Sequence, residues 1–216
     1  MGKKMTKPGP MLYPVPAVMV SCSDGTIDNI VTIGWTGIVN SDPPMTYVSV
    51  RKSRYSHDLI EKQGAFVINL VNEDLVRAAD FCGVKSGRDL DKWQEMGLHK
   101  EPGAEVNVPM IAESPVNLEC VVKEVKELGS HDMFLAEIVA VHIDEKYMAE
   151  DGAYEFERMK LVSYVHGRYF GLRRGELGSF GYSIMKPKTQ RRRRREAVEK
   201  RKAQAGKSFP RNRKKN

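Results

Sequence analysis

A chain of 216 residues with 41% apolar residues is long enough for one substantial domain with an extension. No apolar run approaches the roughly 20 residues that a membrane-spanning helix requires, and prolines interrupt the apolar N-terminal stretch, which argues against a signal peptide. Three cysteines without a C-x-x-C pair fit a reducing cytosol better than a disulfide framework. We therefore predict a cytoplasmic protein with no membrane partner.

The net charge of +7 conceals two regions of opposite sign. Residues 186–216 contain 15 Lys/Arg and two Glu, net +13, which leaves 20 Lys/Arg against 26 Asp/Glu in residues 1–185, net −6. We predict a globular domain over 1–185 and a basic, low-complexity tail over 186–216 that is disordered or forms a lone charged helix. Such a tail favours non-specific nucleic-acid binding, or it is an incidental solubilising extension.

The first half of the chain contains four predicted strands. Each is a short run of β-branched, aromatic or other apolar residues between turn-forming residues. They are residues 17–21, 30–39, 45–50 and 65–71. The second of them is interrupted by Gly34 and Gly37, which let a ligand approach its backbone closely.

Helices are predicted between and after these strands. Ser56 is a suitable N-cap for a helix over 57–63, and Gly64 is its natural stop. Asn72 caps a second helix over 73–81. Residues 82–98 read as a loop followed by a short helix.

The second half is again rich in strands. Residues 116–128 and 133–144 are long antiparallel-type strands joined by a turn over 129–132, and residues 161–172 add one more strand. Cys120, in the middle of a strand, is expected to be a buried apolar residue. Six or seven strands with two or three short helices, and no β–α–β rhythm, predict a mainly β protein, a closed antiparallel barrel with helical caps.

The stretch "VSVRKSRYSHDLI" (48–60) concentrates cations and hydroxyls where a strand gives way to a helix. Backbone N–H groups at a helix start, together with Arg, Lys and Ser, can bind a phosphate. A solvated loop with a serine cap is the alternative. The chain has no dinucleotide-binding glycine motif and no metal-ligand spacing of His and Cys, so we predict no metal site.

Several blocks resemble, in order, the flavin-reductase-like family of FMN-binding split-barrel proteins, which includes flavoredoxin and archaeal ferric reductase. They include "NIVTIGWTGIVNSDPPMTYVSVRKSRYSHDLIEKQGAFVINLV", "GVKSGRDLDKW" and "GSHDMFLAEIVAV", and the resemblance covers roughly residues 11–172. It implies a homodimeric split β-barrel with FMN near the subunit interface. It also implies an oxidoreductase or electron-transfer protein that is reduced by NADH, NADPH or a protein donor.

The same resemblance assigns candidate site residues. Those expected beside the flavin ring, along the ribityl chain and at the phosphate are Thr32, Gly34, Trp35, Thr36, Ser49, Val50, Arg51, Lys52, Arg54, Tyr55, Ser56 and Gly83. His131 matches a family histidine near the reactive face of the flavin, where it helps to position nicotinamide or shuttles a proton, or else it is a solvated turn residue. Some relatives use a cysteine close to the flavin; this chain has Ser49 in that neighbourhood, which puts thiol chemistry in doubt.

Two hypotheses for the function follow. The first is an FMN-dependent oxidoreductase that exchanges electrons with a small molecule or a protein. The second is a nucleic-acid-associated protein that uses the barrel as a dimer scaffold and the basic tail to bind polyanions.

Overall fold

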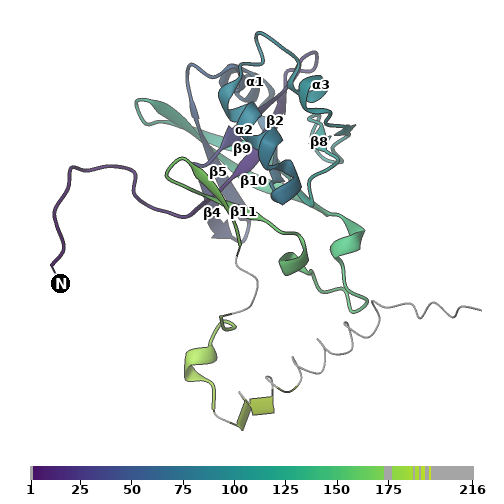
Figure 1. Ribbon diagram of the computed structural model, residues 1–216. Helices are drawn as coiled ribbons and strands as arrows, with labels where there is room; N and C mark the ends of the chain where they lie inside the picture. Colours follow the sequence, from purple (N-terminus) through teal and green to yellow (C-terminus); the bar gives the residue numbers. More distant parts are fainter. Residues whose placement is uncertain (1, 173–176, 187, 190, 193–194, 196–216) are drawn as a thin grey trace, which may run out of the picture. The chain divides into compact units, whose positions relative to one another are not determined.

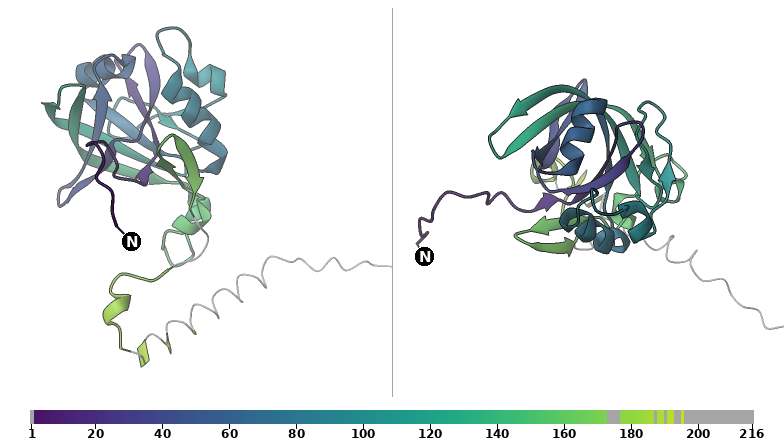
Figure 2. Two further views of the ribbon diagram at one scale, coloured as in Figure 1. Left: turned by 60° about the vertical axis from the view of Figure 1, so that its left-hand side comes forward. Right: turned by 90° about the horizontal axis from the view of Figure 1, so that it is seen from above.

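The main sheet has seven antiparallel strands, and its two edge strands follow each other directly in the sequence. The order across the sheet is β3-β2-β6-β9-β10-β5-β4. The edges are β3 (Asp28–Ile33) and β4 (Thr36–Ser41), and only Gly34 and Trp35 connect them. Because two residues cannot span an open sheet, the sheet curls until its edges meet, and the strands close into a barrel (Figures 1 and 2). The other strands are β2 (Val18–Ser23), β5 (Pro44–Arg51), β6 (Ala65–Leu70), β9 (Val116–Glu127) and β10 (His131–Ile143).

This computed structural model describes residues 2–172, 177–186, 188–189, 191–192 and 195. It divides the chain into two units, Met1–Arg173 and Arg174–Asn216, so the boundary that we predicted at residue 185 lies within the second unit. The predicted tail falls for the most part outside the described residues. Within the described part of the chain, no helix has the length and apolar character to cross a membrane.

Two smaller sheets accompany the barrel. One has the order β1-β11-β12, with β1 at Val15–Pro16, β11 at Val162–Val165 and β12 at Arg168–Gly171; the other pairs β7 (Lys100–Glu101) with β8 (Met110–Ile111). The prediction of a single strand over 161–172 was therefore wrong. The chain reverses at His166 and Gly167, which both have positive φ (46° and 87°), as a two-residue hairpin turn requires.

The first helix, α1 (Tyr55–Gln63), begins earlier than predicted. Ser56 is not its cap: the N-cap position belongs to Arg54, and the buried Ser56 hydroxyl accepts a hydrogen bond from Asn29 Nδ2 at 2.9 Å. The helix stop was predicted correctly, because Gly64 adopts φ 68° and its N–H bonds to the carbonyl of Ile60.

The second helical segment starts as predicted and runs further. Asn72 Oδ1 accepts from the N–H of Leu75, which starts the short 3-10 helix η1 (Glu73–Leu75) and then α2 (Val76–Val84). Gly83 was predicted in a loop but lies in α2. The remaining helices are α3 (Lys92–Met96) and the 3-10 helices η2 (Glu145–Tyr147), η3 (Phe156–Arg158) and η4 (Tyr182–Ile184).

Strands β2 and β6 are buried on both faces, which explains their continuous apolar sequence. Val18, Val20 and Cys22 point into the barrel, where Phe66 and Phe134 are among the largest buried side chains. On the opposite side, α2 and α3 pack on β2 and β3 in a second core with Met19, Ile30, Ala79 and Trp93, and residues 106–110 cover β6. Cys120 is buried in the barrel core, as predicted. The mainly β barrel with short helices is confirmed.

Candidate functional site

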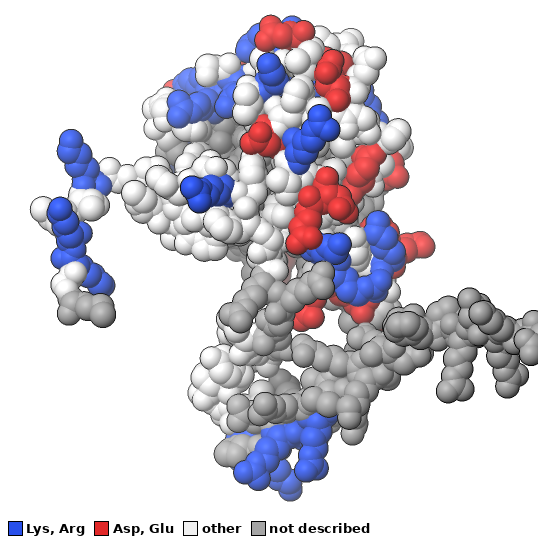
Figure 3. All heavy atoms as spheres, viewed as in Figure 1, with Lys and Arg blue, Asp and Glu red and all other residues white. Residues whose placement is uncertain are grey.

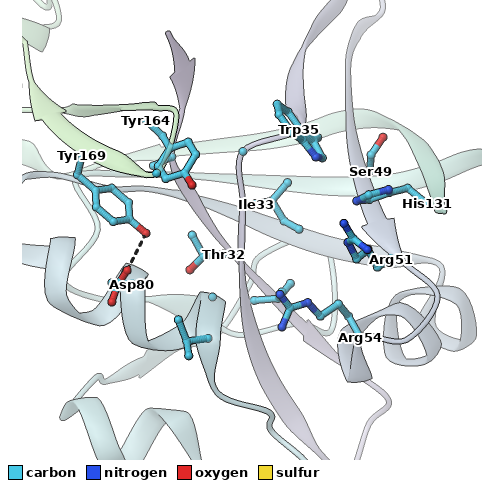
Figure 4. Close-up of a pocket in the computed structure, with 16 residues that line it drawn as sticks. Thr32, Ile33, Trp35, Ser49, Arg51, Arg54, Asp80, His131, Tyr164 and Tyr169 are labelled. Carbon is cyan, nitrogen blue, oxygen red and sulfur yellow. Dashed lines mark hydrogen bonds between the residues drawn. The ribbon is translucent and has the colours of Figure 1, made fainter. Parts of the chain in front are cut away.

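A cavity of about 420 Å³ lies beside the link that closes the barrel. Its floor is β3 and its walls come from the end of β5, from α2 and from the β11–β12 hairpin. The volume falls in the range of about 300–1,000 Å³ that is usual for small-molecule sites. The structure brings eight of the thirteen predicted site residues together here (Figure 4): Thr32, Gly34, Trp35, Ser49, Arg51, Arg54, Gly83 and His131.

Of the eight lining residues that were not predicted from the sequence, five come from α2 and the β11–β12 hairpin. Asp80 and Val84 come from α2, and Tyr164, Gly167 and Tyr169 come from the β11–β12 hairpin. The spacing of Asp80, Gly83 and Val84 is that of one helix face. This signal was available in the sequence, but it was lost when residue 83 was assigned to a loop.

A second cavity, also about 420 Å³, continues from the first and shares Val31, Arg51 and Arg54 with it. Its lining is rich in hydroxyls and cations. Besides the shared residues it is lined by Asn29, Ser53, Tyr55, Ser56, Lys85, Ser86, Gly87 and Lys92. The predicted residues Tyr55 and Ser56 therefore lie at this end.

Overall charge does not single out this site, because Lys and Arg are interspersed with Asp and Glu on the face seen in Figure 3. Pairing does. Lys52 pairs with Glu127 at 2.8 Å, and Arg88 lies 3.6 Å from Asp58. Among the described residues, no carboxylate lies within ion-pair distance of Arg51, Arg54 or Lys92. Unpaired cations that converge on one cavity attract an anion.

Lys92 is the most unusual of these cations, because its side chain is only 3% exposed. Its ammonium donates to the carbonyls of Ile30 at 2.7 Å and Cys82 at 2.9 Å. An ammonium has three N–H donors, so one remains for a ligand in the second cavity. Burial, and secondarily the charge of Arg54, lower the pKa of Lys92. An anion in the cavity would therefore relieve a cost that the empty protein bears.

The loop over residues 85–88 approaches the barrel very closely at Gly87. A Cβ atom there would stand 2.1 Å from Asn29 Oδ1, so only glycine fits. Asn29 cannot easily move away, because it is 3% exposed and donates to Ser56. This contact positions Lys85 and Ser86 at the cavity.

Arg88 ties the same loop to the cation-bearing turn after β5. Its guanidinium stacks on the Tyr55 ring at 4.9 Å and donates to the Ser53 carbonyl at 3.2 Å. Arg88 and Tyr55 thus hold the two sides of the second cavity together.

His131 is the first residue of β10 and not part of a turn as predicted. It is paired in register with Arg51 on β5, so the two side chains are cross-strand neighbours. Burial, together with the positive charge of Arg51, lowers the pKa of His131 below its usual value. The imidazole is therefore neutral at neutral pH and can either accept or donate a proton.

We expect Arg51→Ala to raise the pKa of His131, because it removes a like charge. An NMR pH titration of the imidazole would measure this. Lys52→Ala is the matched control, since Lys52 points to Glu127 and Asp132. An unchanged pKa of His131 in Arg51→Ala would show that the two groups do not interact.

Three predicted site residues do not line either cavity. Val50 is fully buried in the barrel core, and Lys52 is engaged with Glu127 and Asp132. Thr36 is buried and donates from its hydroxyl to the Tyr47 carbonyl at 2.5 Å. In β5 the side chains alternate, so Ser49 and Arg51 face the cavity while Val50 faces inward.

The fold and the site thus define a closed β-barrel with a ring-sized cavity that leads into a cation-lined one. The flavin reductase like domain matches residues 11–173, and the chain belongs to this family. An uncharacterized protein of Pyrococcus abyssi is 31% identical over 136 residues, which is 63% of this chain and 78% of that protein. Flavoredoxin of Desulfovibrio vulgaris is a similar solved structure, with a TM-score of 0.78 and 30% identity over 84% of this chain and 100% of its own. A flavoredoxin from Methanosarcina acetivorans has a TM-score of 0.77 and 28% identity, covering 86% of this chain and 100% of its own.

Proposed function

We propose that this protein binds FMN and works as a flavin-dependent oxidoreductase or electron-transfer flavoprotein. The observation that carries the proposal is the joining of the two cavities at Arg51 and Arg54. The first cavity is flanked by aromatic side chains, which suit a ring system. The second cavity is lined by unpaired cations and serine hydroxyls. A ring with a terminal phosphate on a polar chain matches this arrangement.

Different residues would hold the phosphate and the ring of FMN. Lys92, Arg54 and the hydroxyls of Ser53 and Ser86 would hold the terminal phosphate. Thr32, Gly34, Trp35 and Ser49 would border the ring. FMN, when bound, accepts a hydride and passes electrons onward. His131, neutral beside Arg51, would hold or release a proton at the edge of the ring.

Thiol chemistry has no place in this proposal. The residues that line the first cavity include Ser49 and no cysteine. All three cysteines are free and buried. Burial raises the pKa of Cys22 and Cys120 to about 12 and that of Cys82 to about 11, so the thiols stay protonated. Free thiols also support our proposal of a reducing, cytosolic location.

The experiment for this function is an anaerobic titration of the FMN-loaded protein with NADH and, separately, NADPH. Bleaching of the yellow colour by either would support a nicotinamide electron donor. A loaded protein that neither nucleotide bleaches, but that dithionite reduces, would contain a reducible flavin whose donor is not a nicotinamide nucleotide. A protein that takes up no FMN at all would rule out the proposed function.

We also propose a homodimer. Strand β4 leaves Ile38 68% and Val39 51% exposed, and β10 leaves Val141 54% exposed, which is unusual for branched apolar side chains on strands. A second copy of the chain would cover such surfaces. Sedimentation should give twice the mass of one chain, and a monomer at micromolar concentration would contradict the proposal.

The basic tail is a separate matter. Among the described residues of the second unit, Lys188, Arg191, Arg192 and Arg195 lie together around one hollow. We propose that the tail binds polyanions without sequence preference. No comparison favours a nucleic-acid scaffold as the main function, so this is a secondary role.

Deletion of 186–216 should abolish duplex DNA binding and leave FMN binding unchanged, since residues 1–185 are net acidic at −6. For the intact chain, the log of the binding constant should fall with log salt by a slope of about −0.9 for each neutralised phosphate. Filter binding at several salt concentrations would measure this. Equal DNA binding by both proteins would contradict the tail proposal.

A further inference from the structure

A buried carboxylate contacts both ends of the turn that lines the second cavity. Asp132, the second residue of β10, is 4% exposed. Its Oδ2 accepts a hydrogen bond from His57 Nε2 at 2.8 Å. Its Oδ1 lies 3.5 Å from Lys52 Nζ and accepts no hydrogen bond from the residues that the structure describes. Because a buried carboxylate that is only half satisfied lowers stability, its place in the fold needs an explanation.

The two partners of Asp132 stand on either side of the turn. Lys52 precedes and His57 follows residues 53–56, all four of which line the second cavity. The turn is tight, since the N–H of His57 bonds to the carbonyl of Arg54 at 3.0 Å. Asp132 itself is fixed, because this end of β10 pairs in register with β5. One carboxylate on the sheet therefore holds both ends of the segment that carries the predicted phosphate donors.

The contact with His57 is the stronger of the two. The imidazole is buried and packs edge to face on Phe134, with the ring centroids 5.2 Å apart, and its other ring nitrogen lies 3.3 Å from Asp58 Oδ1. Lys52, by contrast, is half-exposed and pairs more closely with Glu127, at 2.8 Å. Because solvent screens an exposed ion pair, most of the anchoring comes from the buried imidazole and carboxylate.

We propose that Asp132, acting through His57, is a positioning residue that holds the turn over residues 53–56 in the conformation that binds the phosphate of the flavin. Asp132 lines neither cavity, so it acts on the ligand only through the turn. Donors that are fixed before the ligand arrives lower the entropic cost of binding. Asp132 therefore contributes to a preference for FMN over riboflavin. This inference rests on the proposed function, which assigns the second cavity to the phosphate.

Asp132→Asn tests the proposal, because it removes the charge and keeps the size of the side chain. FMN and riboflavin are each titrated by calorimetry into the cofactor-free variant. We expect the affinity for FMN to fall about tenfold, as for the loss of one charge-assisted contact, and the affinity for riboflavin to stay the same. A merely structural defect would weaken the binding of both flavins alike. An unchanged ratio of the two affinities would overturn the proposal.

Glu119→Gln is the matched control, a buried carboxylate on the neighbouring strand β9. It accepts hydrogen bonds from the N–H groups of Ala104 and Val106 and from His142 Nε2, and it lines neither cavity. Its substitution should lower the melting temperature and leave the ratio of FMN to riboflavin affinity unchanged.

A second variant covers the case in which Asp132→Asn does not fold. His57→Leu combined with Asp132→Val removes both partners of the buried hydrogen bond at once, so neither is left unsatisfied. The same fall in the ratio of FMN to riboflavin affinity is expected, because the turn again loses its contact with β10. A native ratio in this double variant would equally overturn the proposal.

Amide hydrogen exchange of the cofactor-free protein gives a readout that needs no flavin. The N–H groups of Arg54 and His57, which bond within the turn, should exchange faster in Asp132→Asn and at the native rate in Glu119→Gln. If the native protein takes up neither flavin, the proposed function fails, and the exchange rates alone decide whether Asp132 holds the turn. Native exchange rates in Asp132→Asn would overturn the positioning role whether or not a flavin binds.

Discussion

Substitution of Lys92 by Met should weaken FMN binding by about a hundredfold, because a buried charge-assisted contact to phosphate contributes roughly 3 kcal/mol. Lys92 is 3% exposed, and it reaches the second cavity with one N–H not used by the carbonyls of Ile30 and Cys82. Calorimetric titration of the cofactor-free variant with FMN would measure the loss. Thermal melting should show that the barrel still folds.

The matched control is Lys62→Met. Lys62 lies on α1 and pairs with Asp24 at 2.9 Å, away from both cavities, so its loss should not change FMN affinity. Equal FMN affinity of Lys92→Met and the native protein would show that the phosphate binds at another place.

The pH dependence of binding gives a second view of Lys92. Burial lowers its pKa in the empty protein, and a bound phosphate would raise it. Between these two pKa values FMN binding takes up a proton. The FMN affinity should therefore fall as pH rises through the lowered pKa of Lys92, which lies below the usual lysine value of about 10.4. The free energy of unfolding of the empty protein should rise with pH above the lowered pKa of Lys92. The reason is that the buried lysine destabilises the folded state less once it is deprotonated. Lys92→Met should lack this alkaline loss of affinity.

Substitution of Gly87 by Ala should weaken FMN binding by at least about tenfold, because a displaced loop no longer positions its phosphate donors. The added Cβ would stand 2.1 Å from Asn29 Oδ1, a distance that the buried, hydrogen-bonded Asn29 cannot relieve without displacing Ser56 or the loop. The substitution disturbs the cavity and not the barrel core. We therefore expect a clear loss of FMN affinity with only a small change in melting temperature.

Gly37→Ala is the control for this substitution. Gly37 lies on β4, and a Cβ there would meet the Tyr47 ring at an ordinary 3.5 Å. Native-like FMN affinity in Gly87→Ala would mean that the loop over residues 85–88 is not part of the binding site.

Most strands were predictable because each carries its own signal, but the single strand predicted over 30–39 is two strands, β3 and β4. The apolar run at 65–71 and the turn at Gly64 need no knowledge of the rest of the chain. The closure of the barrel is different in kind. It depends on β3 and β4 lying at opposite edges of the sheet, and nothing local in Gly34-Trp35 indicates this.

The errors have two physical causes: a distant contact that overrides a local preference, and a turn that lacks its usual local signal. Serine is a residue type that favours the N-cap position, but the hydroxyl of Ser56 accepts a hydrogen bond from Asn29 instead. The hairpin at His166-Gly167 lacks the Asn-Gly or Asp-Gly that usually announces a two-residue turn, so 161–172 read as one strand.

The site was predicted best where it follows a single strand-to-helix junction. Arg51, Arg54 and Ser56 were found there, whereas Asn29 and Lys92 were missed because they reach the same cavity from other elements. Asp80, Tyr164 and Tyr169 were missed for the same reason, since α2 and the β11–β12 hairpin meet only in the folded protein.

The most direct test of the account compares FMN with riboflavin, which has the same ring and ribityl chain but no phosphate. Both are titrated into the cofactor-free protein at neutral pH, where the phosphate is largely a dianion because its second pKa is about 6. The unpaired cations around the second cavity predict that FMN binds at least about a hundredfold more tightly than riboflavin. Equal affinity for the two, or no binding of either, would contradict the assignment of this cavity to a flavin phosphate.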